Sequence, residues 1–165
     1  MNPAPSTDAS ATPSRSQIRP ANTAWEALLQ AHASLMGVYA AESMWTEVSM
    51  REYDVLYTLA KSPSPLRLSE LRDGVLLSQP ALSRMVDRLI TRELVSREAD
   101  PQDARAVRIS LTDQGRRVQR RVGRAHARSV AREVGSALND EEIAQLDELC
   151  RKLAARKTPG PGYQS

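Results

Sequence analysis

The chain has 165 residues, of which 41% are apolar and 26% are charged, and its formal net charge is +3. This length suits one domain with helical extensions, and this composition is typical of a soluble globular protein. The net charge is too small to indicate a nucleic-acid partner by itself. Only three of the 23 basic residues are lysines. The others are arginines, whose planar guanidinium groups suit bidentate contacts with bases, phosphates and carboxylates.

Several classes of protein are excluded by what the sequence lacks. A single cysteine, Cys150, excludes an internal disulfide and fits a reducing compartment. No apolar run approaches the roughly 18 residues needed to span a bilayer, and the N-terminus lacks the apolar core of a signal peptide. We therefore expect a cytoplasmic protein without a membrane partner. The sequence has no phosphate-binding glycine loop, metal-ligand cluster or nucleophile–base pattern, so we expect no enzymatic activity, no metal and no cofactor.

The N-terminal part combines a polar tail with a long helical pattern. Residues 1–20 are rich in Pro, Ser, Ala and Thr. They are predicted to be disordered, because so little apolar surface cannot offset the entropy of ordering. A helical pattern runs from Asn22 to about Trp45, with His32 on its broad apolar face. A histidine in such a place is most often a core or interface residue, and His126 is its only companion as a metal ligand.

The next segment predicts two short helices joined by a tight connection. A capping box, Ser49 with Glu52, opens a helix that ends before Pro63. Residues 66–68 are expected to be extended, and Ser69 is predicted to cap a short third helix. Only a few residues separate this helix from one that begins after Ser78. Two such helices, the second with a polar outer face, predict a helix-turn-helix.

The helix predicted over residues 79–92 has the chemistry of a DNA-reading helix. Ser78 is a suitable N-cap, and Pro80 fits the first turn, where its missing N–H costs nothing. At 100° per residue, one face is apolar and the opposite face carries guanidinium, amide and hydroxyl groups. In the major groove, Arg reads guanine and Gln reads adenine. Taken alone, the same pattern also fits a surface helix with a solvated face. The apolar face consists of Leu82, Met85, Val86 and Leu89, and the polar face of Gln79, Ser83, Arg84, Asp87 and Arg88.

A β-hairpin with a charged tip follows this helix. Strand-like runs over residues 94–99 and 107–111 flank the segment DPQDARA, which predicts a hairpin of the kind called a wing. Asp103 and Arg105 are two residues apart, so in an extended chain both side chains point to one side. Asp103 can therefore hold the Arg105 guanidinium.

Two helices are predicted after the hairpin, one basic and one with an acidic first half. Thr112 caps the first, to about Ala137, and Asn139 opens the second; residues 158–165 are predicted to be disordered. Like charges one turn apart repel, so a stripe of arginines requires anionic partners, which we expect on the last helix, within or between subunits. The arginines are Arg117, Arg121, Arg124, Arg128 and Arg132, and the acidic residues are Asp140, Glu141, Glu142, Asp147 and Glu148. The apolar stripes suit a dimer core. They consist of Val118, Val122 and Ala125, and of Ile143, Leu146, Leu149 and Leu153.

The amino-acid sequence of this region resembles that of one protein family. DPQDARAVRISLTDQG resembles the wing of the MarR/SlyA family of winged-helix transcription regulators, which reads D-x-x-D-x-R, a strand, then L-T-x-x-G. LRLSELRDGVLLSQPALSRMVDRLITRELVSR is similar to the family's helix-turn-helix. The resemblance covers about Asn22 to Ala155. Two positions depart from the family pattern, because Glu93 replaces a small residue in a turn and Ala104 replaces a second basic residue in the wing.

The resemblance implies a fold and a function. The fold is mainly α with one small β-hairpin, in which a winged helix-turn-helix (residues 49–111) is embedded in a helical dimerisation region (residues 21–47 and 112–157) of a single domain, 21–157. The function is that of a homodimeric, ligand-responsive repressor that binds double-stranded DNA at a pseudo-palindromic operator. The family's DNA-contacting positions carry over to Ser78, Gln79, Pro80, Ser83, Arg84, Arg88, Asp103 and Arg105.

The same resemblance implies a small effector. Many members of the family are released from DNA by small aromatic or phenolic ligands, and others sense oxidants with a cysteine near the first helix, which this chain lacks. We place an effector near the aromatic residues of the first two long helices, although core packing is the alternative role for each. These residues are Trp25, His32, Tyr53 and Tyr57. A rival interpretation is a helical protein–protein adaptor that uses the winged helix for docking, but the arginines of the polar face and the wing favour DNA.

Overall fold

The computed structural model describes residues 14–101 and 103–155, and the chain divides into two compact units between Ala41 and Glu42. The first unit contains the helix α1, Arg15–Ala40. The prediction of disorder over residues 1–20 is wrong for residues 15–20, which are helical; residues 1–13 lie outside the described chain. The physical reason is a capping box: the backbone N–H of Ser14 donates to Gln17 Oε1 at 3.0 Å.

The helix α1 also ends earlier than predicted, at Ala40 instead of Trp45. Residues 42–48 form an irregular stretch, which we call the connecting segment, between α1 and the next helix. Trp45 therefore lies outside any helix. The consequence for the site is described below, because its ring contacts the second helix.

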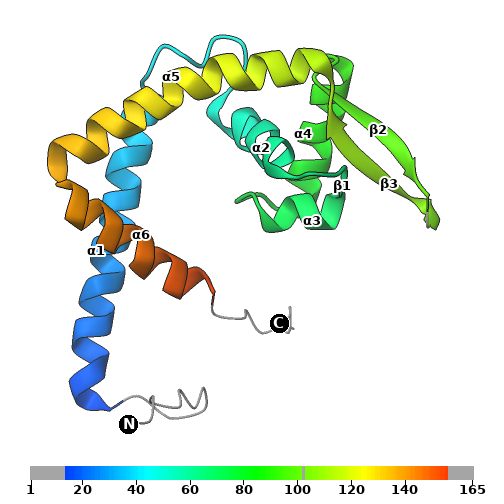
Figure 1. Ribbon diagram of the computed structural model, residues 1–165. Coiled ribbons are helices and arrows are strands. Elements are labelled where there is room, and N and C mark those ends of the chain that lie inside the picture. The colour runs from blue at the N-terminus through cyan, green and yellow to red at the C-terminus, as the bar shows by residue number, and fades with distance from the viewer. Residues whose placement is uncertain (1–13, 102, 156–165) are drawn as a thin grey trace, which may run out of the picture. The chain divides into compact units, whose positions relative to one another are not determined.

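The second unit contains the remaining elements, and its order of helices and strands confirms the mainly helical fold class (Figure 1). The capping box of Ser49 with Glu52 and the caps at Thr112 and Asn139 are confirmed. Ser69 is not a cap, because the Glu70 side chain accepts the backbone N–H of Arg67 and the third helix begins one residue before Ser69. The elements are α2 (Met50–Lys61), β1 (Leu66–Arg67), α3 (Leu68–Asp73), α4 (Gln79–Thr91), β2 (Val95–Asp100), β3 (Asp103–Leu111), α5 (Asp113–Ala137) and α6 (Asp140–Ala154).

The wing belongs to a three-stranded antiparallel sheet with the order β1-β3-β2. Leu66 of β1 pairs with Ile109, so a short strand before the helix-turn-helix is added to the predicted hairpin. The turn of the hairpin is shorter than the predicted segment DPQDARA, because β3 begins at Asp103, opposite Asp100. Figure 1 shows the hairpin extending away from α3 and α4.

The core lies between α2, α3, α4, the sheet and the first half of α5. The predicted apolar face of α4 is buried completely, since none of its four large side chains is more than 6% exposed. Burying four such side chains contributes on the order of 1.5–3 kcal/mol each. The polar face of α4 is thereby forced outward. The four residues are Leu82, Met85, Val86 and Leu89.

The turn that ends α4 has a strained residue at its centre. Glu93 has φ = 57°, a left-handed conformation that costs a residue with a Cβ roughly 1–2 kcal/mol. Two hydrogen bonds close the turn in a Schellman motif, from Glu93 N to Ile90 O and from Leu94 N to Leu89 O. As predicted, this turn is formed without a glycine. Glu93 keeps the strained conformation, and the two hydrogen bonds offset its cost.

The start of α5 is fixed against this turn. Thr112 Oγ1 donates to the Glu93 carbonyl at 2.6 Å and accepts the Gly115 N–H at 3.0 Å. A Cβ atom on Gly115 would lie 1.9 Å from the Leu94 carbonyl oxygen. Only glycine permits this approach, so the junction of α4, β2 and α5 depends on that residue.

Neither a membrane-spanning helix nor a metal-binding cluster is found among the described residues. None of the helices is long and apolar enough to cross a bilayer. No group of three or more His, Cys, Asp and Glu side chains is placed to hold a metal ion.

Candidate nucleic-acid interface

The outward face of α4 carries the predicted contact residues. Ser78 occupies the N-cap position as predicted, although its side chain makes no capping hydrogen bond, and Pro80 lies in the first turn. Gln79, Arg84 and Arg88 are exposed. A helix that presents polar side chains near its N-terminal end, while its opposite face is buried, can enter the major groove without disturbing its own core.

The two arginines of this face are free to bind a ligand. Within the described chain, neither Arg84 nor Arg88 forms an ion pair or a side-chain hydrogen bond. Gln79 differs, because its Oε1 accepts a long hydrogen bond of 3.4 Å from Arg72 Nη1 of α3. The Gln79 amide group is thereby turned so that its NH₂ group remains available as a donor.

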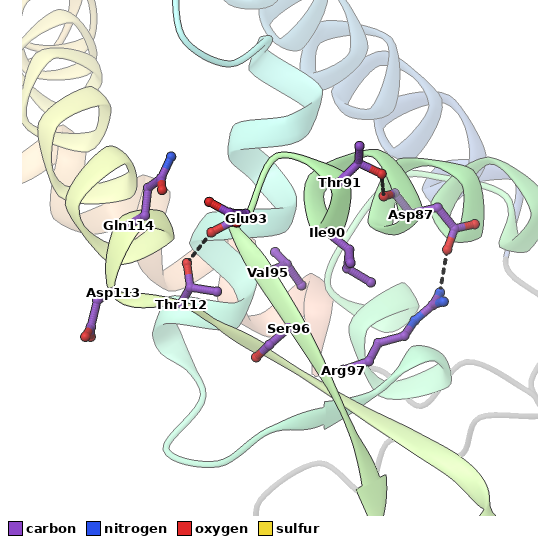
Figure 2. A pocket seen from close by; sticks show the side chains of 10 residues that line it. All are labelled: Asp87, Ile90, Thr91, Glu93, Val95, Ser96, Arg97, Thr112, Asp113 and Gln114. Carbon is purple, nitrogen blue, oxygen red and sulfur yellow. Dashed lines mark hydrogen bonds and ion pairs between the residues drawn. The ribbon is translucent and has the colours of Figure 1, made fainter.

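An ion pair links α4 to the wing. Asp87 of α4 lies 2.8 Å from Arg97 Nη2 of β2. Figure 2 shows this pair at the edge of an open depression of about 840 Å³ between α4, β2 and the start of α5. Glu93 and Asp113 also line the depression, so its charged groups are negative on balance and it does not extend the cationic face of α4.

A buried aspartate at the turn end of β2 binds arginines of the other two strands. The Asp100 side chain is 0% exposed, and its Oδ2 lies 2.7 Å from Arg67 Nε of β1 and 3.1 Å from Arg108 Nε of β3. Arg108 also donates to the Pro65 carbonyl at 3.1 Å. A charge inside a protein is tolerated only with such partners. Sequence reasoning placed Asp100 in the turn and missed this role, because its partners come from strands that only the folded sheet brings together.

Of the two predicted DNA contacts in the wing, the structure describes the side chain of one. Asp103 is exposed at the start of β3, and its charge contributes to a raised pKa of Arg67, after the larger effect of Asp100. The side chain of Arg105 lies outside the described part of the chain. The predicted pair of Asp103 with Arg105 therefore stays a prediction.

A second concave region, a groove of about 660 Å³, lies between α2 and α5. One wall is aromatic: the rings of Tyr53 and Tyr57 stack at 5.9 Å, and His126 meets Tyr53 edge-on at 5.6 Å. Burial is the main reason why the pKa of Tyr53 is raised and that of His126 is lowered. Arg120 and Arg124 of α5 also line the groove, and within the described residues neither forms an ion pair.

Only two of the four predicted effector residues line this groove. Tyr53 is buried, whereas Tyr57 is 43% exposed, which argues against pure core packing for Tyr57. Trp25 and His32 belong to α1, in the other compact unit, and both are exposed. The residues that sequence reasoning missed are Trp45, whose ring lies 5.7 Å from Tyr53, and His126. His126 follows Val122 by four residues and so shares its helix face, a signal that could have placed it.

The arginine stripe of α5 does not pair as predicted within the subunit. Arg121 pairs with Glu47 and Arg132 with Glu42, both in the connecting segment. Two of the acidic residues of α6 instead pair with bases one turn later in their own helix. The expectation is wrong for these two arginines, because the connecting segment lies along α5 and supplies the nearer carboxylates. The pairs of α6 are Asp147 with Arg151 and Glu148 with Lys152.

These features define a class of protein. A helix-turn-helix followed by a two-stranded wing, with an extra strand completing the sheet, is a winged helix-turn-helix, and here its second helix presents unpaired guanidinium groups. A model of the MarR family matches residues 48–107. The chain belongs to the MarR family.

Individual relatives agree with this assignment. The HTH-type transcriptional regulator PecS of Dickeya dadantii is 30% identical over 109 residues, which are 65% of this chain and 65% of PecS, so the match spans just under two thirds of that relative. The MarR family transcriptional regulator Sco3205 of Streptomyces coelicolor, solved in complex with DNA, is 26% identical with a TM-score of 0.72, covering 94% of this chain and 96% of that chain. PcaV of Streptomyces coelicolor, solved with its natural ligand, is 30% identical with a TM-score of 0.60, covering 89% and 99%.

The buried aspartate predicts a specific loss of stability. We expect Asp100→Asn to lower the free energy of unfolding by about 1.5–3 kcal/mol, because Arg67 loses a charged hydrogen-bond partner and Arg108 loses the carboxylate that pairs with it. Glu98→Gln is the matched control, since Glu98 is exposed on the same strand and forms no ion pair with another described residue. Urea unfolding followed by circular dichroism measures both. Equal stabilities of the two variants would contradict the anchoring role.

Proposed function

We propose that this protein is a homodimeric, sequence-specific regulator of transcription that binds double-stranded DNA and acts as a ligand-responsive repressor on a pseudo-palindromic operator. The observation that carries the proposal is the pair of unpaired arginines, Arg84 and Arg88, on the exposed face of a helix whose other face is buried. The complex of Sco3205 with DNA supports it by similarity.

In this proposal α4 lies in the major groove and the wing lies beside it. Arg84 and Arg88 contact base edges, with Ser78, Gln79, Pro80 and Ser83 completing the surface at the start of the helix. Arg105 enters the adjacent minor groove or meets a phosphate, where readout is degenerate, and Asp103 orients it. Two such surfaces in a dimer would meet half-sites about 34 Å apart, one helical turn of DNA.

The base contacts lead to a prediction about sequence preference. We expect Arg84→Ala and Arg88→Ala each to weaken binding to the preferred duplex by on the order of 1–3 kcal/mol, and to weaken binding to a scrambled duplex much less. Fluorescence anisotropy with the region upstream of the gene, and with its scrambled sequence, measures both affinities. Arg151→Ala, on α6, is the control. Variants that keep the wild-type preference would show that α4 does not read bases.

The groove between α2 and α5 is our proposed effector site. Its aromatic wall of Tyr53, Tyr57 and His126 suits a planar ring, and Arg120 with Arg124 suits an acidic group on that ring. A small aromatic or phenolic acid has both properties. The structure of PcaV with its natural ligand supports an effector by similarity.

The position of Trp45 provides a test of this site. Because its ring lies 5.7 Å from Tyr53, we expect 4-hydroxybenzoate to quench the fluorescence of Trp45 and to release DNA over the same concentration range. Trp25→Phe should keep the quenching, and Trp45→Phe should abolish it. A panel of phenolic acids that changes neither fluorescence nor DNA binding would leave these aromatic residues with a packing role.

Exposed apolar side chains support the homodimer. Leu149 of α6 is 50% exposed and Trp25 of α1 is 56% exposed, and several neighbours in each helix are similar. On each helix separately, several large exposed apolar side chains of this kind are typical of a protein interface. The acidic start of α6 forms no ion pair with another described residue, so Asp140 and Glu141 could meet Arg128 of a second copy.

The dimer has a direct test. We expect a wild-type dimer at micromolar concentration in sedimentation velocity, and we expect Leu149→Glu to raise its dissociation constant more than tenfold by placing a charge in the apolar interface. Glu148→Gln, one residue away, should change it little. A wild-type monomer would contradict the proposal, as would a Leu149→Glu variant that remains fully dimeric.

A further inference from the structure

Two carboxylates of the connecting segment (residues 42–48) bind side chains of α5. Glu42 Oε1 accepts a 2.6 Å hydrogen bond from Ser129 Oγ and pairs with Arg132, and these contacts, the Ser129 bond foremost, hold the pKa of Glu42 below its usual range. Glu47 accepts a 2.7 Å hydrogen bond from Arg121 Nε. Arg121 and Arg132 are about three turns apart on α5, so the segment follows the helix over that length.

Arg92, the C-cap residue of α4, connects this segment to the DNA-facing helix. Its Nη1 lies 3.1 Å from Glu52 Oε1 of α2, and its Nη2 donates to the Glu47 carbonyl. The other oxygen of Glu52 accepts the Ser49 backbone N–H at 2.8 Å. One guanidinium group therefore binds the end of the connecting segment and the start of α2 together.

These contacts border the groove between α2 and α5. Glu52 directly precedes Tyr53, and Arg121 lies on α5 beside the groove residue Arg120. The two helices are in close contact here, because a Cβ on Gly123 would lie 2.9 Å from Tyr53 Oη. Trp45, in the middle of the connecting segment, packs on the Tyr53 ring. A change in the spacing of α2 and α5 would thus move both groups that hold Arg92.

We propose that Arg92 is a positioning residue, through which the spacing of α2 and α5 sets the orientation of the recognition helix α4 on DNA. This inference rests on the proposed function and assigns a route to the regulation of its effector groove. Arg92 acts through Glu52 and the Glu47 carbonyl, and its guanidinium does not itself bind a phosphate.

The direction in which one substitution changes the affinity for DNA distinguishes a positioning role of Arg92 from a phosphate contact. Glu52→Gln keeps the capping box, because glutamine serves at that position, but it removes the charge that holds Arg92. We expect two- to fivefold weaker binding to the duplex from upstream of the gene, with an unchanged dependence of the dissociation constant on salt. Tighter binding, which a released phosphate-binding arginine would produce, would overturn the proposal.

A second experiment measures the coupling itself. Gly123→Ala pushes on Tyr53, and we expect it to weaken binding to the same duplex several-fold in the wild-type background. In the Arg92→Gln background, the dissociation constant measured with Gly123→Ala divided by that measured without it should fall to about one. Gly135→Ala is the matched control, because nothing lies within 4 Å of its added Cβ. Thermal unfolding of each variant verifies that it is folded.

The outcomes separate the two proposals. A Gly123→Ala ratio that is the same in both backgrounds would overturn the role of Arg92 and leave DNA binding intact. An unaltered protein that binds neither this duplex nor any duplex selected from a random pool would overturn the proposed function, and the role of Arg92 with it.

Discussion

The close approach of two backbones, at Leu94 and Gly115, is the constraint on which the winged helix depends. The carbonyl of Leu94 occupies the space that a side chain on residue 115 would need. Glu93 accepts a left-handed conformation so that the chain can turn from α4 into β2 at this point. Thr112 completes the junction by binding both the turn and the start of α5. The orientation of the recognition helix relative to the wing and to α5 is therefore fixed by backbone geometry, and side-chain charges add to it.

The arginines of this chain have two physical roles, and the structure separates them. Arg67 and Arg108 are held by the buried Asp100, and Arg97 is held by Asp87, so these residues fix strands and helices in place. Arg84 and Arg88 have no such partner within the described residues. A charge that is already paired gains little from a phosphate or a base, whereas an unpaired one can exchange water for a ligand. This division leaves only a few of the many arginines for the proposed DNA-facing surface.

The contacts of the connecting segment join the groove between α2 and α5 to the end of α4, the proposed DNA-reading helix. Its carboxylates bind α5, its tryptophan packs on the aromatic wall, and its Glu47 carbonyl binds Arg92. Each contact is weak, since solvent screens exposed ion pairs. Regulation of DNA affinity by a few-fold requires no more than that.

The sequence by itself determined the features that depend on near neighbours in the chain. The apolar face of α4, the caps at Ser49, Thr112 and Asn139, and the two long strands of the wing follow from periodicity and from side chains within four residues, and all are found in the structure. The start of α1 at Arg15 differs from the prediction, because the polar composition of residues 1–20 indicates disorder whereas a local capping box starts the helix there.

Only the tertiary structure decided the contacts between distant segments. The third strand, the burial of Asp100 and the pairing of Arg121 with Glu47 join residues far apart in the sequence, and no periodicity encodes them. Charge pattern alone assigned the α5 arginines to the acidic α6, because it counts charges and not distances. The fold placed the connecting segment nearer, and electrostatic attraction favours the closest partner.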